Sequence, residues 1–153
     1  MSKCLVCSSP FTPFVDFGDM PIANDFSKKQ DTKGDYLFRM QVGFCENCYM
    51  VQLLEQPDRE KMFHENYAFF ASTSSYMVEH FKRFSESVIT KLNLNSNSLV
   101  VELGSNDGIM LQHFRNADVG CLGVEPSENV AEAAREKGIE VISKFFDLEL
   151  ATT

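Results

Sequence analysis

Four cysteines form two pairs that could bind one metal ion. Cys4 and Cys7 make one Cys-x-x-Cys turn, and Cys45 and Cys48 make a second, with 37 residues between the pairs. Such a turn presents both thiolates to the same ion, and two turns complete the tetrahedral sulfur set of a structural zinc site. Because four thiolates leave no open coordination position, we predict a structural and not a catalytic Zn²⁺.

Disulfides and a redox pair are the alternatives for these cysteines. A thioredoxin-like pair would need a strand before the motif and a helix after it, and neither turn has that context. The odd number of cysteines and the absence of a secretory signal favour reduced thiols and a cytoplasmic location. Cys121 lies inside a predicted strand, where we expect a buried core thiol.

A glycine loop is the second candidate site. Glu102, Gly104 and Gly108 follow the pattern Glu-x-Gly-x-x-x-Gly between a predicted strand and a predicted helix. Gly104 would allow a tight turn, and Gly108 would let the helix begin close to the strand. The dinucleotide pattern G-x-G-x-x-G fails at Asn106 and Ile109. The spacing is instead typical of proteins that bind S-adenosylmethionine (SAM), although a tight turn in another α/β domain remains the alternative.

An acidic residue ends the next predicted strand. Glu125 lies 21 residues after Gly104, where its carboxylate could accept both hydroxyls of an adenosine ribose. Acidic side chains also suit the cationic groups of SAM. Phe145, Phe146 and Asp147 follow the third strand and could form an apolar wall and bind the adenine amine, or simply belong to the core. The predicted cofactor site comprises Glu102, Gly104, Ser105, Asn106, Gly108, Glu125 and Phe146.

The elements that position these sites define three regions. Residues 1–57 are rich in prolines and short alternating stretches, as expected of a small zinc module that needs a metal for stability. Residues 58–95 should be a connecting helical segment, with hydroxyl residues at 72–75 as N-caps. Residues 96–153 should be the N-terminal part of a Rossmann-like SAM-binding domain. The helix in the connecting segment should bury Met77, Phe81, Phe84, Val88 and Leu92.

Strands and helices alternate in the last region. The predicted strands cover residues 99–103, 120–125 and 139–142, and the helices cover 109–115 and 128–137. This order predicts an α/β fold in which the first half of a Rossmann-like domain, β-α-β-α-β, forms a parallel sheet.

Composition disfavours two classes of partner. A net charge of −8 with no basic stripe disfavours a nucleic-acid partner, although isolated zinc modules often bind nucleic acids. No apolar run approaches the length of a membrane span, so we expect no membrane partner.

Several motifs together resemble the sugar C-methyltransferases of deoxysugar pathways, which carry an N-terminal zinc-binding domain before the SAM domain. The resemblance covers the whole chain. The motifs are Cys4-x-x-Cys7, Asp16-Phe-Gly-x-x-Pro21, Val42-Gly-x-Cys45-x-x-Cys48-x-Met-Val-Gln52, Met62-Phe-His-Glu-x-Tyr67, Ser72-x-Ser-Ser75, Glu102-x-Gly-x-Asn-Asp-Gly-Ile-Met-Leu111, Gly123-x-Glu-Pro-Ser127 and Ala134-Arg-Glu-Lys-Gly-Ile139.

The resemblance implies an activity and a substrate. In such enzymes a base removes a proton beside a keto group of a nucleotide-linked sugar, and the enolate attacks the methyl group of SAM. It also implies that Tyr67 lies near the sugar, whereas packing of this ring between modules is the structural alternative. A non-catalytic zinc-binding interaction module with a vestigial nucleotide-binding fold is the competing function.

Members of this family continue well past the third strand, so we expect this chain to be an N-terminal fragment or a short relative. The catalytic residues cannot be named from the sequence, and His64, His80 and His113 are its only histidines. The apolar strand at 99–103 would have one unpaired edge, through which the chain could associate. Purified alone, such a chain should bind zinc and have weak or no affinity for SAM.

Overall fold

The fold is α/β, as the sequence predicts, and it divides into two compact units. The computed structural model describes residues 2–24, 26 and 34–152. One unit covers Met1–Met62 and the other covers Phe63–Thr153. The predicted connecting segment, residues 58–95, is therefore split between the two units.

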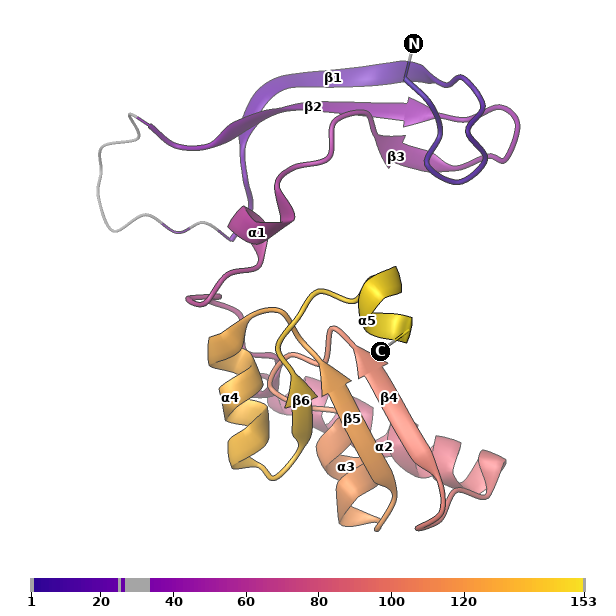
Figure 1. The fold of residues 1–153 in the computed structure, drawn as a ribbon, viewed down its shortest axis with the longest axis vertical. Helices are drawn as coiled ribbons and strands as arrows, with labels where there is room; N and C mark the ends of the chain where they lie inside the picture. The colour runs from indigo at the N-terminus through magenta and orange to yellow at the C-terminus, as the bar shows by residue number, and fades with distance from the viewer. Residues whose placement is uncertain (1, 25, 27–33, 153) are drawn as a thin grey trace. The chain divides into compact units, whose positions relative to one another are not determined.

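The first unit is built on a three-stranded antiparallel sheet (Figure 1). Its strands are β1 (Thr12–Pro21), β2 (Leu37–Phe44) and β3 (Val51–Leu53), in the order β1-β2-β3. The short helix α1 (Arg59–Met62) follows the sheet. The metal-ligand turns are placed by this sheet, because one precedes β1 and the other connects β2 to β3.

A carboxylate supports the irregular part of β1. The register against β2 shifts between Asp16 and Asp19, and Gly18 there has a positive φ of 76°. Asp16 accepts hydrogen bonds from Gly18 N at 2.9 Å and from Gln41 Nε2 at 2.9 Å, and it pairs with Arg39 at 2.6 Å. The Gly18 amide and the Arg39 guanidinium lower the pKa of Asp16. A local bulge is thus held by side chains from two strands.

The core of the first unit is small. Among the described residues, its buried cluster consists of Cys4, Phe11 and Cys45. The Phe11 ring packs directly over Gly43, where an added Cβ would lie 2.2 Å from the ring. Two of the three core residues are metal-ligand candidates, so the stability of this unit depends on what they bind.

The second unit contains a parallel sheet with the predicted alternation of strands and helices. The strands are β4 (Leu99–Leu103), β5 (Gly120–Val124) and β6 (Glu140–Ile142), in the order β4-β5-β6. The helices α3 (Leu111–Asn116) and α4 (Glu128–Glu136) connect them, and α5 (Leu148–Thr152) follows β6. The parallel register places Leu103 beside Val124 and Val124 beside Ile142, so all three strands end at one edge.

The long helix α2 (Ser75–Leu92) begins as predicted but turns a different face inward. Ser74 is its N-cap and accepts from Met77 N at 3.3 Å. Phe84 and Leu92, predicted to be buried, are 48% and 61% exposed. Ser85 is fully buried instead, and its hydroxyl donates to Phe81 O at 2.8 Å. The spacing rule was wrong at two positions, because the face of α2 that packs on the core around Leu111 and Phe114 carries Val88 and Ile89.

Among the described residues, helices cover one face of β4 and leave the other exposed. In Figure 1, α2 and α3 lie behind β4 and β5, and the core beneath them gathers around Leu111 and Phe114. On the opposite face, Leu99, Val101 and Leu103 are 65%, 49% and 53% exposed. Among the described residues no helix is both long and apolar enough to cross a bilayer.

Candidate functional site

The four predicted metal ligands lie together. The sulfur atoms of Cys4, Cys7, Cys45 and Cys48 are all within 4.8 Å of one another. Cys4 Sγ lies 3.6 Å from Cys48 Sγ, and Cys7 Sγ lies 3.5 Å from Cys45 Sγ. Sulfurs bound tetrahedrally to zinc at about 2.3 Å are separated by about 3.8 Å. The cluster therefore has the size that a zinc ion requires.

The two Cys-x-x-Cys turns have the same backbone geometry. Ser8 N donates to Cys4 O at 2.9 Å, and Tyr49 N donates to Cys45 O at 2.8 Å. Each turn closes with a second bond, from Cys4 N to Ser9 O and from Cys45 N to the Met50 carbonyl, both at 2.9 Å. Because both turns are built alike, they present four thiols to one point from opposite sides.

Hydrogen bonds favour the ionised form of Cys7, which is the form that binds a cation. Side-chain hydrogen bonds from Asn47 and Ser9 lower the pKa of Cys7 to about 5. Against the lowering effect of the Met50 amide, burial and the neighbouring thiols raise the pKa of Cys48 to about 12. Without an ion, four adjacent thiolates would repel one another, so full deprotonation requires a bound dication.

Gln52, which the ligand pattern does not include, supports the first turn. Its Oε1 accepts from Leu5 N at 3.1 Å and lies 3.5 Å from Cys4 Sγ. This amide links β3 to the turn that holds two of the ligands, as outer groups around metal sites commonly do.

A cavity lies at the glycine loop in the second unit. Its volume is about 340 Å³. Its walls combine apolar side chains with two carboxylates and the loop backbone. The lining residues are Phe63, Tyr67, Phe69, Ala71, Met77, Phe81, Glu102, Gly104, Ser105, Asn106, Ile109 and Glu125.

Glu102 contributes an unpaired carboxylate to this cavity. Its Oε2 is buried and has no hydrogen-bond partner among the described residues. Burial and the charge of Glu125 raise the pKa of Glu102 to about 7. A buried acceptor without a partner destabilises the protein unless a ligand satisfies it. A cationic ligand fits this position.

Glu125 fixes the loop as well as facing the cavity. This side chain is 5% exposed. Its Oε2 accepts from Asn106 N at 2.9 Å, and its Oε1 accepts from Ser127 N at 2.9 Å. Each carboxylate oxygen can accept more than one hydrogen bond, so ribose hydroxyls could still bind to it.

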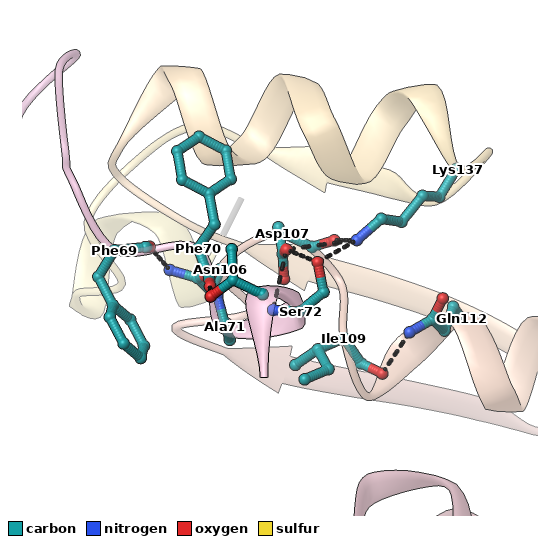
Figure 2. Close-up of polar contacts among 10 residues, drawn as sticks. Phe69, Phe70, Ala71, Ser72, Asn106, Asp107, Ile109, Gln112 and Lys137 are labelled. Carbon is teal, nitrogen blue, oxygen red and sulfur yellow. Dashed lines mark hydrogen bonds and ion pairs between the residues drawn. The ribbon is translucent and has the colours of Figure 1, made fainter. Parts of the chain in front are cut away.

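The aromatic segment, residues 67–72, is tied to the glycine loop by side chains (Figure 2). Asn106 Oδ1 accepts from Ala71 N at 2.8 Å, and Asn106 Nδ2 donates to Phe69 O at 2.9 Å. Asp107 Oδ2 accepts from Ser72 N at 3.1 Å and also from the Ser72 hydroxyl. The side chain of Asn106, predicted to face the cofactor, is therefore occupied by the backbone of this segment.

Of the other predicted cofactor residues, some line the cavity and some lie outside it. Gly104 and Ser105 line the cavity, but the Ser105 hydroxyl faces β5, where a Cβ at Gly123 would lie 2.4 Å from it. Gly108 packs against Ile139 outside the cavity. Phe146 is 50% exposed and is not among the lining residues.

Asp147, considered as an adenine contact, has another role. Its Oδ1 accepts from Leu150 N at 3.0 Å and so stabilises the first turn of α5.

Tyr67, by contrast, does line the cavity. Burial and the charge of Glu125 raise its pKa, and its carbonyl accepts from Asn129 Nδ2 at 2.7 Å.

Sequence reasoning missed the residues that shape the far side of the cavity. Phe63, Met77 and Phe81 lie upstream of the glycine loop by more than twenty positions. Lys137 was also missed, although its Nζ donates to Asp107 O at 2.6 Å and to Ser72 Oγ at 3.3 Å. The sequence predicts an N-cap and a family motif at the hydroxyl residues 72–75, but nothing in the spacing links Ser72 to Asp107.

Comparison with known proteins supports the zinc-binding cluster and gives one relative of the whole chain. Residues 4–63 match a family model described as "Putative zinc binding domain". Over 152 residues, or 98% of its length, the chain is 30% identical to "C-methyltransferase NovU" of Streptomyces niveus. The match covers 36% of that protein, so the chain spans about a third of the length of this relative. Residues 4–63 thus resemble a zinc-binding domain, within a chain that is similar along nearly its whole length to part of a C-methyltransferase.

Proposed function

We propose that the cavity of the second unit binds SAM and that the protein is a methyltransferase acting on carbon. The observation that carries the proposal is the unpaired, buried Oε2 of Glu102 in a cavity with apolar walls. A ligand suited to this cavity combines a positive charge with a large apolar or aromatic part. SAM has both, and when bound it supplies an electrophilic methyl group.

The residues divide the binding of SAM among themselves. Glu102 would attract its positive charge, and Glu125 would accept hydrogen bonds from its ribose. Met77, Phe81 and Ile109 would pack against its apolar surface and exclude water. The loop backbone at Gly104 approaches the ligand without a Cβ, and nothing lies within 4 Å of the position that a Cβ would take.

For the substrate, we propose a nucleotide-linked keto-deoxysugar. This part rests on the resemblance to sugar C-methyltransferases and on the name of the relative, which is a C-methyltransferase. Tyr67 supports it, since its raised pKa keeps the hydroxyl protonated near neutral pH. Tyr67 could therefore donate a hydrogen bond to a sugar oxygen, and it is poorly suited to act as the base. A cytoplasmic location remains a prediction from the sequence.

The zinc ion has a separate, structural role in this proposal. Its four thiolate ligands would leave no position for a substrate. The first unit would need the ion to complete its small core, and no catalytic step would pass through the metal.

Titration of the zinc-loaded chain with SAM, followed by NMR, tests the proposal. SAM is added to several millimolar because the expected affinity is weak. We expect saturable shifts at Glu102, Ser105 and Ile109, and Glu102→Gln should weaken binding about tenfold. Glu140→Gln is the matched control, since Glu140 lies on β6 and does not line the cavity.

A native chain that binds zinc but shows no saturable shifts with SAM would contradict the proposal. That result would favour the non-catalytic interaction module. Equal affinities of the native chain and Glu102→Gln would show that the unpaired carboxylate does not bind the ligand.

A further inference from the structure

We propose that Asn106 and Asp107 are positioning residues, which hold the aromatic segment (residues 67–72) in place as a wall of the ligand cavity. The inference deepens the proposed function and rests on it for the identity of the ligand. It differs from the sequence prediction, in which Asn106 contacts the cofactor itself.

The aromatic segment makes few backbone hydrogen bonds within itself. Backbone groups that are removed from water need partners. The partners of this segment are mainly side chains from the glycine loop and α4. Asn129 binds the Tyr67 carbonyl, Asn106 binds Phe69 O and Ala71 N, and Asp107 binds Ser72 N. These side chains therefore determine the conformation of the segment.

Asn106 is suited to this role by its own backbone. Its φ of 48° lies in the left-handed region, which asparagine adopts more readily than most residues. The carboxamide offers one acceptor and one donor, and the segment presents the matching amide and carbonyl two residues apart (Figure 2). An aspartate here would lose the donor to Phe69 O.

Asp107 is held in position by a third element. The residue is 1% exposed, and its Oδ2 lies 3.4 Å from Lys137 Nζ at the end of α4. The same Nζ donates to Ser72 Oγ. A buried carboxylate thus joins the loop, the segment and the helix, and a neighbouring ammonium balances its charge.

The link reaches the ligand site through Asn106 N, which donates to Glu125 Oε2. Asn106 therefore connects Glu125, which is proposed to bind the ribose, with the aromatic segment that carries Tyr67 and Phe69. Displacing the side chain of Asn106 should loosen the wall while leaving the sheet and its core unchanged.

Two readouts on the zinc-loaded chain test the inference. Hydrogen exchange measures protection of the Ala71 amide, and titration with SAM measures affinity. Asn106→Gly keeps the left-handed backbone without strain and removes both side-chain bonds. We expect exchange at Ala71 to accelerate at least about tenfold and SAM affinity to fall about fivefold, with an unchanged urea midpoint.

The matched control is Asn93→Gly. Asn93 is also left-handed, with a φ of 51°, and it is exposed at the end of α2. It should leave both readouts at native values. Asp107→Asn, which retains an acceptor for Ser72 N, should restore more protection of the Ser72 amide than Asp107→Ala. This pair of variants separates loss of the hydrogen bond from loss of buried volume.

Three results would overturn the inference. Native exchange at Ala71 in Asn106→Gly would show that the segment is held by other groups. Faster exchange with native affinity would show that the segment is not a wall of the ligand site. Lower affinity with native exchange would show that Asn106 touches the ligand directly. If the native chain binds no SAM, the proposed function fails, and the exchange comparison still decides whether Asn106 fastens the segment.

Discussion

Ser8 and Tyr49 occupy equivalent positions in the two halves of the metal site. Each directly follows the second cysteine of its turn, and each has a left-handed backbone, with φ of 60° and 62°. This conformation costs about 1 kcal/mol for a residue with a Cβ. Both positions are therefore strained, although glycine would adopt the conformation without strain. The strain is retained because this turn conformation brings the cysteine ligands together.

Replacing Ser8 with glycine should relieve one of these strained positions. We expect Ser8→Gly to raise the free energy of unfolding of the zinc-loaded chain by about 0.5 kcal/mol, as measured in urea. Tyr49→Gly should have almost no net effect, because it also removes the ring contact with Phe44 at 6.2 Å. Strong destabilisation by Ser8→Gly would mean that the side chain has a role beyond the turn.

Loss of one metal ligand should unfold the first unit. Cys45→Ser removes a fully buried ligand, and we expect loss of zinc together with loss of protection in β1, β2 and β3. Metal analysis and hydrogen exchange measure the two effects. Cys121→Ser is the control, since Cys121 lies on β5 in the second unit. It should retain a full equivalent of zinc, and a β-sheet that survives metal removal would contradict the prediction.

Titration of Glu102 should make stability depend on pH. Its pKa is about 7 in the folded protein, above the ordinary value of about 4.3. The folded state therefore keeps the proton more tightly, and stability falls as pH rises from about 4 to 7. Glu102→Gln, which cannot ionise, should be more stable than the native chain by about 2 kcal/mol at pH 8. The two should be equal near pH 4 in urea unfolding experiments.

The same titration predicts the pH dependence of ligand binding. A cation interacts with the ionised form of Glu102, so the affinity for SAM should increase as pH rises from 6 to 8. The affinity of Glu102→Gln should stay constant over this range. A native affinity that falls with rising pH would indicate that Glu102 binds its ligand as a neutral acid.

The two glycines of the loop should respond differently to substitution. Both have positive φ, 76° at Gly104 and 72° at Gly108. Gly104→Ala should cost only the backbone strain, about 1 kcal/mol, because the space around it is open. Gly108→Ala should cost about 3 kcal/mol, since the new Cβ would lie 2.4 Å from Ile139 Cδ1. Thermal unfolding of both variants provides the comparison, and equal losses would contradict it.

Local patterns explain which parts of the structure the sequence could predict. The cysteine turns and the strand ends that carry Glu102 and Glu125 follow from spacing within short segments. The parallel strands end at one edge of the sheet, which brings the two carboxylates to one cavity. Both features depend on chain geometry over a few residues, and so they can be inferred without knowing how distant segments pack.

Other features depend on packing between distant segments. Asn106 and Phe69 are 37 residues apart, and no periodicity relates an amide side chain to a carbonyl at that separation. The spacing rule also failed to predict the buried face of α2, since Ser85 is buried while Phe84 is 48% exposed. Phe146 lies in the loop between β6 and α5, and no local pattern specifies the direction of that loop.

The exposed face of β4 should affect how the protein behaves in concentrated solution. Leu99, Val101 and Leu103 form an apolar row on a strand that has no neighbour on one side within the described residues. Such a strand can add to another chain through both its backbone and its side chains. We expect light scattering to increase with protein concentration, and Val101→Lys to suppress the increase. We therefore expect this surface to limit the colloidal stability of the second unit.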